Sequence, residues 1–580
     1  MERRTFDDAP MKIRIVLYLF LLSFVETTTA QVLWNTEEAY PKREIRAVWV
    51  TTLSGLDWPK TKATSQTGIA RQQAELCQLL DQLKAANINT ILLQTRVRGS
   101  VIYPSGIEPW DNALTGQYDR NPGYDPLAFA VEECHRRGME LHTWIVTIPA
   151  FKVNVAKKMG GRGLLSTHPE LLKKHNDMYY LDPGLPGTAD YLSSLLREFI
   201  GKYDIDGIHF DYIRYPENAN SFPDESTYRK YGKGQAKADW RRDNITAIVR
   251  RLYREVKAVK PWVKMSCSPV GKYRDTRRYS SRGWNCYDAV YQDAQGWLKE
   301  GIQDLLFPMM YFTGDHFYPF AADWKEGSHG RYVAPGLGIY FLSPNEKDWD
   351  LNVISRELHY LRRRDLGGQA YFRSQFLTDN TKGIYNYLRQ NYYTCPALPP
   401  AYPWLDNEAP TRPEGFTCTE IDRQMCELRW LPSKDNLPAG VRYNVYASKE
   451  YPVDVSRAEN IIAANLQECR YTYNQHYGLH IAVTAIDRCG NESKPVQLGG
   501  GSTPLNDAEG GLHYMSHDGH MLKLPDLETE FYLITDLPGR ELQTGKYAHQ
   551  IDISQLPRGI YRVRTLQKHG ISRLIGEFRK

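Results

Sequence analysis

The stretch DGIHFDYIRYP at residues 206–216 has the pattern of a buried strand that ends in charged groups. Side chains alternate between the two faces of a strand. His209 and Asp211 therefore share one face, and the apolar residues between them share the other. If the apolar face packs under helices, Asp211 emerges at the C-terminal end of the strand, while Asp206 anchors its start as a structural cap.

Seven further apolar runs alternate with amphipathic helical patterns between residues 44 and 390. The predicted strands are 45–52, 89–97, 140–146, 206–213, 263–270, 304–312, 332–340 and 367–373. The predicted helices include 72–87, 125–138, 188–203 and 239–261. Strand–helix units in series imply parallel strands, and eight such units close a (β/α)8 barrel. We therefore predict an α/β fold with a TIM-type barrel over residues 43–393. A doubly wound open sheet is the alternative, but no G-x-G-x-x-G follows the first strand.

The last third of the chain changes to a period of two. Residues 394–416 are rich in proline and predict a linker. Residues 410–500 resemble a fibronectin type III β-sandwich, a likeness carried by Trp430, by YNVYA at 443–447 and by VTAIDRCGNES at 483–493.

A second linker is predicted at residues 498–511, before a small β-rich module at 512–580. The sequence IDISQLPRGIYRVR within this module resembles the C-terminal sorting modules of secreted proteins from gram-negative bacteria. The resemblance suggests attachment to the cell envelope, and the alternative is an accessory module that no longer sorts.

Composition and the N-terminus restrict the class of protein. A net charge of +5 over 580 residues is too weak for a nucleic-acid footprint. A basic start at Met11, an apolar run and a small residue at Ala30 predict a signal peptide over residues 1–30. No later stretch is apolar enough to span a membrane. We expect a soluble monomer that is periplasmic, on the outer surface or secreted, and the nine cysteines allow disulfides in the last third.

The reactive groups of a barrel lie at the C-terminal ends of its strands. Three aspartates are candidates for catalysis. They are Asp211, Asp293 and Asp182. The last two precede helices, so helix capping explains them equally well, and His209 is equally a core histidine. The candidates for substrate binding are Arg96, Arg98, Glu108, Trp110, His142, Trp144, His209, Arg214 and Tyr311.

Paired carboxylates beside aromatic platforms are the usual equipment for glycoside hydrolysis. One acid protonates the leaving oxygen, and the other attacks the anomeric carbon or activates water. The sequence lacks a G-x-S-x-G elbow, a phosphate-binding loop and a His/carboxylate cluster at ligand spacing. We therefore expect no metal and no cofactor.

Long motifs resemble the glycosyl-hydrolase-like family ten group over roughly residues 43–390. They include REIRAVWVTTLSGLDWP (43–59), YYLDPGLP (179–186), DGIHFDYIRYP (206–216) and SCSPVGKYRD (266–275). The resemblance implies a TIM-type barrel and β-glycosidic cleavage of an amino-sugar polymer, most of all peptidoglycan that lacks stem peptides. The family's aspartates fall on Asp211, Asp182 and Asp293. This chain has one Asp in HFDY and no acid after Arg373, which departs from the family pattern.

Two rival functions remain at this level. The first is an exported glycoside hydrolase, and the second is a carbohydrate-binding envelope protein on an inactive barrel. A second carboxylate facing Asp211 would favour the hydrolase. A metal-dependent deacetylase lacks the expected ligand set.

Overall fold

The computed structural model describes residues 40–580, apart from 282–283, 422–424, 475–478, 498–514, 516, 525–528, 530, 537–539 and 567–571. The predicted signal peptide and the predicted linker at 498–511 fall outside this part of the chain. Within the described residues, no helix has both the length and the apolar character needed to cross a membrane. All nine cysteines lie within the described residues, and no disulfide bond joins any of them there.

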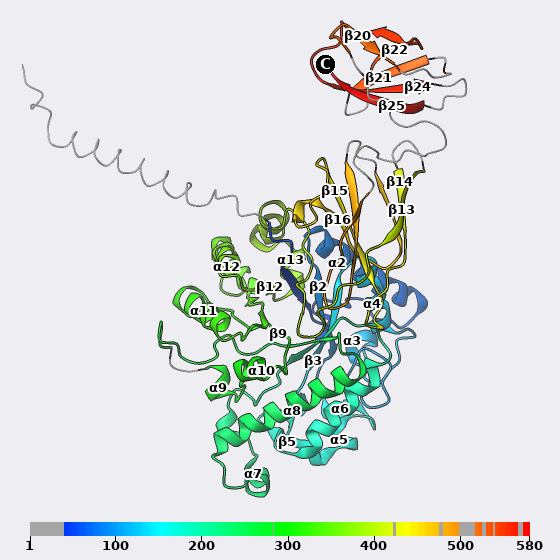
Figure 1. Cartoon of the computed structure of the whole chain (residues 1–580). Coiled ribbons are helices and arrows are strands. Elements are labelled where there is room, and N and C mark those ends of the chain that lie inside the picture. The colour runs from blue at the N-terminus through cyan, green and yellow to red at the C-terminus, as the bar shows by residue number, and fades with distance from the viewer. Residues whose placement is uncertain are drawn as a thin grey trace, which may run out of the picture. The chain divides into compact units, whose positions relative to one another are not determined.

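A closed parallel barrel forms the first part of the fold (Figure 1). Its strands are β1 (Ile45–Val50), β2 (Thr90–Arg96), β3 (Glu140–Val146), β7 (Gly207–Asp211), β8 (Lys264–Cys267), β9 (Leu305–Leu306), β10 (Tyr332–Val333), β11 (Gly336–Leu337) and β12 (Gly368–Tyr371). The order along the sheet is β10-β9-β8-β7-β3-β2-β1-β12-β11. Strands β10 and β11 are two halves of one run, of which the first pairs with β9 and the second with β12. This run closes the sheet on itself, so the predicted TIM-type barrel is confirmed.

The helices that surround the barrel form where the amphipathic patterns predict them. They include α2 (Gln66–Ala85), α4 (Pro126–Arg136), α6 (Pro186–Ile200), α8 (Lys237–Val259), α10 (Ala294–Glu300), α11 (Tyr318–Glu326) and α12 (Leu351–Arg363). Helix α4 begins where Asp125 accepts a hydrogen bond from the Ala128 N–H at 3.1 Å and Pro126 fixes the first turn. Helix α2 starts earlier than predicted because Ser65 caps it.

The interior of the barrel is filled by large side chains. The Trp49 and Phe307 rings lie edge-on to each other, with centroids 5.9 Å apart, and both contact His209. The Trp49 Nε1–H donates to His209 Nε2 at 3.1 Å. Inward-facing His209 confirms the alternation predicted for the fourth strand and places Asp211 one layer above it.

A small antiparallel sheet is inserted between β3 and α6. It consists of β4 (Pro149–Lys152), β6 (Met178–Leu181) and β5 (Leu172–His175), in that order. The sequence pattern did not predict it, because each strand has only four residues. This insertion stands beside the C-terminal end of β7 and forms one wall of the cavity described below.

Two antiparallel sheets follow the barrel and share one core. The first contains β13 (Glu414–Glu420), β14 (Met425–Leu431) and β17 (Arg470–Asn474). The second contains β16 (Ile461–Leu466), β15 (Arg442–Ser448), β18 (His480–Ile486) and β19 (Val496–Gln497). Trp430 of the first sheet packs on Tyr443 of the second, with ring centroids 5.3 Å apart. The β-sandwich is therefore present, and its assignment to the fibronectin type III class stays a prediction.

The predicted linker at 394–416 is in fact packed against the barrel. Leu398 and Tyr402 are buried, and the Leu398 N–H donates to the Lys42 carbonyl at 2.8 Å. Asn89 donates to the Ala397 carbonyl at 3.0 Å. Proline-rich composition correctly predicted irregular backbone but not burial, since the apolar residues between the prolines provide the contact.

The sandwich covers the N-terminal end of the barrel strands through a buried ionic cluster. Arg488 donates to Asp206 at 2.8 Å and to Asp204 at 2.7 Å. The other oxygen of Asp206 lies 2.8 Å from His135 Nε2 and accepts the Leu141 N–H at 2.9 Å. Gly138 makes the close approach possible, because a Cβ there would lie 2.1 Å from the Ala464 carbonyl oxygen. The predicted anchoring role of Asp206 is confirmed.

The described C-terminal residues form two further small sheets. One pairs β20 (Met521–Lys523) with β23 (Gln550–Asp552). The other has the order β22 (Glu541–Lys546), β21 (Phe531–Asp536), β24 (Ile560–Leu566) and β25 (Ser572–Arg579). The β-rich character predicted for this module is therefore present.

Candidate active site

Asp211 ends β7 at the mouth of the barrel, where it is 6% exposed. The Trp144 Nε1–H on β3 donates to its Oδ2 atom at 3.1 Å. The Ser268 hydroxyl, which follows β8, donates to Oδ1 at 2.9 Å, and the Tyr212 N–H donates to Oδ1 at 2.8 Å. Donors from β3, from the end of β7 and from the segment after β8 thus orient one carboxyl group. Oδ2 accepts one of these hydrogen bonds and can accept a further one.

Burial raises the pKa of Asp211 above the ordinary aspartate value. The hydrogen bond from Ser268 and the charge of Arg214 act in the opposite direction but do not cancel the effect of burial. A carboxyl group with a raised pKa at a strand end is a recognised signature of proton-transfer chemistry.

An aromatic wall stands beside Asp211. Tyr311 follows β9, and its ring lies 5.5 Å from that of Phe372 and 5.6 Å from that of Tyr340, centroid to centroid. Burial raises the pKa of the Tyr311 hydroxyl, and the nearby charge of Asp211 raises it further. Tyr311 is thus within electrostatic range of Asp211, at the rim where the sequence predicted it.

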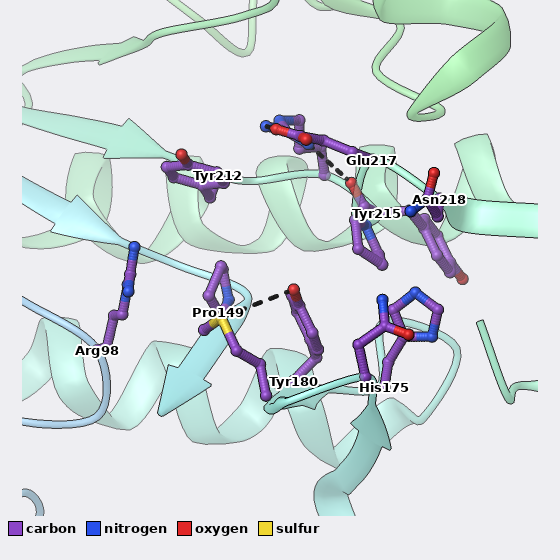
Figure 2. A pocket seen from close by; sticks show the side chains of 12 residues that line it. Arg98, Pro149, His175, Tyr180, Tyr212, Tyr215, Glu217 and Asn218 are labelled. Atoms are coloured by element: carbon purple, nitrogen blue, oxygen red, sulfur yellow. Dashed lines mark hydrogen bonds and ion pairs between the residues drawn. The ribbon is translucent and has the colours of Figure 1, made fainter. Parts of the chain in front are cut away.

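A cavity of about 230 Å³ lies beside Tyr212, the residue that follows Asp211, between the segment after β7 and the inserted β4–β6 sheet. Figure 2 shows Arg98 extending toward Tyr212 on one side of the cavity, with Tyr180 and His175 on the inserted sheet. Tyr212 has a φ of 51°, an unfavourable value for an aromatic residue. Such strain at a strand end is typical of functional sites.

Two arginines, Arg98 and Arg214, line the cavity. Arg214 is buried, its Nη1 donates to the Tyr215 carbonyl at 3.1 Å, and its guanidinium lies 4.6 Å from the Tyr212 ring centroid. Glu217, a residue that the sequence analysis did not single out, also lines the cavity and lies 3.7 Å from Arg214. In the sequence, Glu217 is the next charged residue after Arg214 in the segment that follows β7.

Comparison with known proteins identifies the family. The model of the family described as glycosyl hydrolase-like 10 matches residues 44–329. Glycosyl hydrolase YngK of Bacillus subtilis (strain 168) is 30% identical over 501 residues, which cover 82% of this chain and 97% of YngK. The chain belongs to the glycosyl hydrolase-like 10 family. It is a glycoside hydrolase with a TIM-type barrel.

A second relative and a solved structure were also matched. Glycosyl hydrolase DigH of Escherichia coli (strain K12) is 32% identical over 387 residues, which cover 60% of this chain and 87% of DigH. Among solved structures, the glycoside hydrolase domain of PgaB (BpsB) from Bordetella bronchiseptica matches with a TM-score of 0.41 and 14% identity. That match covers 60% of this chain and 98% of the PgaB domain chain.

Two of the residues predicted to bind substrate in this glycosyl hydrolase-like 10 protein form a buried ion pair instead. Arg96 donates to Glu108 at 2.6–3.0 Å, and the Tyr191 hydroxyl donates to the same carboxylate at 2.6 Å. Pairing of β2 with β3 shifts by one residue between Gln94 and Arg96, so Arg96 turns outward against α6. This bulge breaks the alternation of β2, so Arg96 does not point to the inside of the barrel.

Trp110 also differs from its prediction as an exposed platform. Its side chain is buried in the main core, and its backbone bridges to Val101. Besides the rings around Tyr311, aromatic surface comes from Tyr180 on the inserted sheet and from Tyr212 and Tyr215 after β7.

The two barrel histidines lie below the mouth. His142 is buried beside Gly207 and near Glu140, whose Oε2 lies 3.2 Å from His142 Nε2. Burial lowers the pKa of His209 well below its ordinary value, so His209 is neutral near pH 7. His209 also contacts Ser266 Oγ at 3.0 Å. This position fits the alternative that His209 is a core histidine. Burial also stands against a substrate contact at His142.

The other two candidate aspartates have hydrogen-bond partners of their own. Asp182 is buried and accepts the Thr227 hydroxyl at 2.6 Å and the Gly184 N–H at 3.0 Å. Asp293 caps α10 through the Gly296 N–H at 3.1 Å and accepts the Tyr273 hydroxyl at 2.6 Å. Their catalytic roles stay predictions, since capping accounts for the contacts of Asp293 and burial shields Asp182.

One further carboxylate, Asp57, lies at the strand-end side of β1. It accepts the Thr51 N–H at 2.8 Å and the Gln375 N–H at 3.1 Å and forms an ion pair with Arg373. The pair joins the ends of β1 and β12. In the described part of the chain, no group of three or more His, Cys, Asp or Glu residues is positioned to hold a metal ion.

Proposed function

We propose that this glycoside hydrolase cleaves β-glycosidic bonds in amino-sugar glycan strands, above all peptidoglycan strands that lack stem peptides. We assign Asp211 as the catalytic carboxylate. The observation that supports the assignment is a buried carboxyl group with a raised pKa, oriented by three donors at the barrel mouth. The sequence motifs shared with glycosyl-hydrolase-like family ten support the choice of glycan.

The reaction breaks the bond between the anomeric carbon and the leaving oxygen. The leaving oxygen takes a proton, and the oxygen of a water molecule ends on the anomeric carbon. The raised pKa lets Asp211 retain a proton to higher pH than an ordinary aspartate, which suits the donation step. Trp144 and Ser268 keep the carboxyl group in one orientation during that transfer.

A second group must attack or activate water. Glu217 is our first choice, because it lines the cavity beside Tyr212 and because its charge, like that of Asp211, adds to the effect of burial in raising the pKa of the Tyr212 hydroxyl. The alternative is the 2-acetamido group of the substrate acting as an internal nucleophile, with Asp211 orienting it. Loss of turnover in Glu217→Gln supports the first arrangement, and full turnover in that variant supports the second. The same assay on Asp293→Asn and Asp182→Asn tests the other two candidate aspartates.

The decisive experiment incubates the purified protein with peptidoglycan, either intact or stripped of stem peptides by an amidase. Mass analysis of released sugars is expected to show products from stripped strands alone, and none with Asp211→Asn. Binding of stripped strands without any release would favour the carbohydrate-binding alternative. An active and normally folded Asp211→Asn protein would exclude Asp211 as the catalytic group.

We extend the proposal to the setting of the protein: an exported monomer in the periplasm, on the outer surface or secreted, with its C-terminal module serving envelope attachment. The N-terminal pattern over residues 11–30 and the composition of residues 512–580 support this setting. Cell fractionation of the full chain and of a variant without residues 512–580 tests it, because release of the truncated protein from the envelope is the expected result.

A further inference from the structure

The cavity lined by Tyr212 contains buried polar atoms that have no hydrogen-bond partner among the described residues. Arg214 is 3% exposed and His175 is 6% exposed, yet Arg214 Nε and His175 Nε2 have no hydrogen-bond partner within the described residues. Both residues line the cavity. Buried polar atoms without a partner are costly and rare, so two of them around one cavity point to a ligand that supplies the partners.

The cavity is also positively charged in its interior. Burial raises the pKa values of the Tyr180 and Tyr212 hydroxyls, and the charges of Arg98 and Arg214 oppose this rise at both side chains, so both guanidinium groups lie within electrostatic range of this pair of tyrosines. Arg98 forms no hydrogen bond or ion pair within the described part of the chain, and Figure 2 shows it directed toward Tyr212. The charge of the Arg98 guanidinium group is therefore available to a ligand.

Two acidic groups also face these tyrosines. The charges of Glu217 and Asp177 raise the pKa of the Tyr180 hydroxyl. The Glu217 side chain is 66% exposed, and Asp177 is exposed as well. Water screens both carboxylates, whereas Arg214 is buried, so the inner part of the cavity stays cationic.

We propose that this cavity binds a carboxylate carried by a sugar of the substrate, next to the bond that is cut. A guanidinium group matches the two oxygens of a planar carboxylate, and His175 protonated on Nε2 can donate to the same ligand. A space of about 230 Å³ suits a side group of one sugar rather than a peptide chain.

This inference rests on the proposed function and adds a reason for its substrate preference. Muramic acid carries a lactyl carboxyl group that is free only where the amide bond to a stem peptide has been removed. A cavity that requires the free carboxylate therefore selects peptide-free strands by charge. A neutral amino-sugar chain offers this cavity no anion.

The test compares peptide-free strands with the same strands after conversion of their carboxylates to N-methylamides. We expect the wild-type protein to prefer the free carboxylate by about ten-fold or more in kcat/KM, the effect of one charge-assisted contact. In Arg98→Gln the ratio of the two rates should fall toward one, and Arg98→Lys should restore part of it. Arg229→Gln is the matched control, since Arg229 lies on α7 (Glu225–Tyr231) with 77% side-chain exposure.

Equal cleavage of both strands by the wild-type protein would overturn the inference while leaving the proposed hydrolase intact. A protein that cleaves neither strand would contradict the proposed function. In that case the inference is tested by a binding measurement alone. Titration of Asp211→Asn with a disaccharide of N-acetylglucosamine and N-acetylmuramic acid, and with neutral diacetylchitobiose, gives that readout. Tighter binding of the anionic disaccharide, lost in Asp211→Asn/Arg98→Gln, supports the cavity, and equal binding overturns it.

Discussion

Two aspartates bracket the same strand and behave in opposite ways. Asp206 precedes β7 and is surrounded by cations, whereas Asp211 ends β7 and is surrounded by neutral donors. Burial would raise the pKa of Asp206, but the charges of His135 and Arg488 hold it well below the usual range. At Asp211 the hydrogen bonds and the more distant Arg214 leave the pKa raised. Burial alone therefore does not identify a reactive acid, and the partners decide.

The largest expected effect is at the upper aspartate. Asp211→Asn keeps the shape of the side chain but removes its proton chemistry, so we expect kcat to fall about 10²–10⁴-fold. The thermal unfolding midpoint should stay close to that of the wild-type protein, which a calorimetric scan checks. An equal loss in Asp206→Asn, measured per folded molecule, would contradict the division between the two ends.

The next effect is on stability at the lower aspartate. Arg488→Met leaves Asp206 with less compensating charge in a buried position, so we expect the free energy of unfolding to fall by about 3–5 kcal/mol. Urea denaturation measures it. Arg429→Gln, on an exposed part of β14, is the control and should change stability by less than about 1 kcal/mol. Comparable losses in both variants would mean that the buried cluster has no special weight.

The lower aspartate should also give a pH signature. Its folded pKa is depressed, so the stability that it contributes is present above the unfolded value of 3.8 and is lost as pH falls through the folded pKa. Asp206→Asn should therefore cost about 2 kcal/mol at pH 7 and progressively less below about pH 4. Denaturation curves of both proteins across this range provide the measurement. A stability difference that does not change with pH would exclude ionisation as its origin.

The smallest effect concerns the environment of the upper aspartate. Ser268→Ala removes a donor that lowers the pKa of Asp211, so that pKa should rise further. The limb of the pH profile of kcat/KM that reports Asp211 should move to higher pH, by less than about one unit for a single hydrogen bond of about 1 kcal/mol. Ser266→Ala, one layer below beside His209, is the control. A shift to lower pH would show that another group controls that limb.

The sequence predicted the barrel well because its signals are repetitive. Eight apolar runs, capped helices and the alternation around His209 all point to one arrangement, and Asp211 follows from it. The position of Arg96 could not be predicted, since one extra residue in β2 reverses every face beyond it and leaves no mark in the periodicity. Glu217 and His175 were missed for another reason, because a short inserted sheet and an irregular segment bring them together across more than forty residues.

Because Arg488 of the sandwich contacts Asp206 of the barrel, the two parts of the protein depend on each other. The family match ends at residue 329, before β10, β11 and β12 have closed the barrel. A chain that ended at residue 393 would contain the complete barrel. It would, however, expose the barrel surface that Leu398 covers, and it would leave Asp206 without Arg488. The family match thus covers a shorter segment than the one that keeps Asp206 paired with Arg488. Exchange of the sandwich between homologues therefore requires that the incoming sandwich supply a basic residue for the aspartate at the base of the recipient barrel.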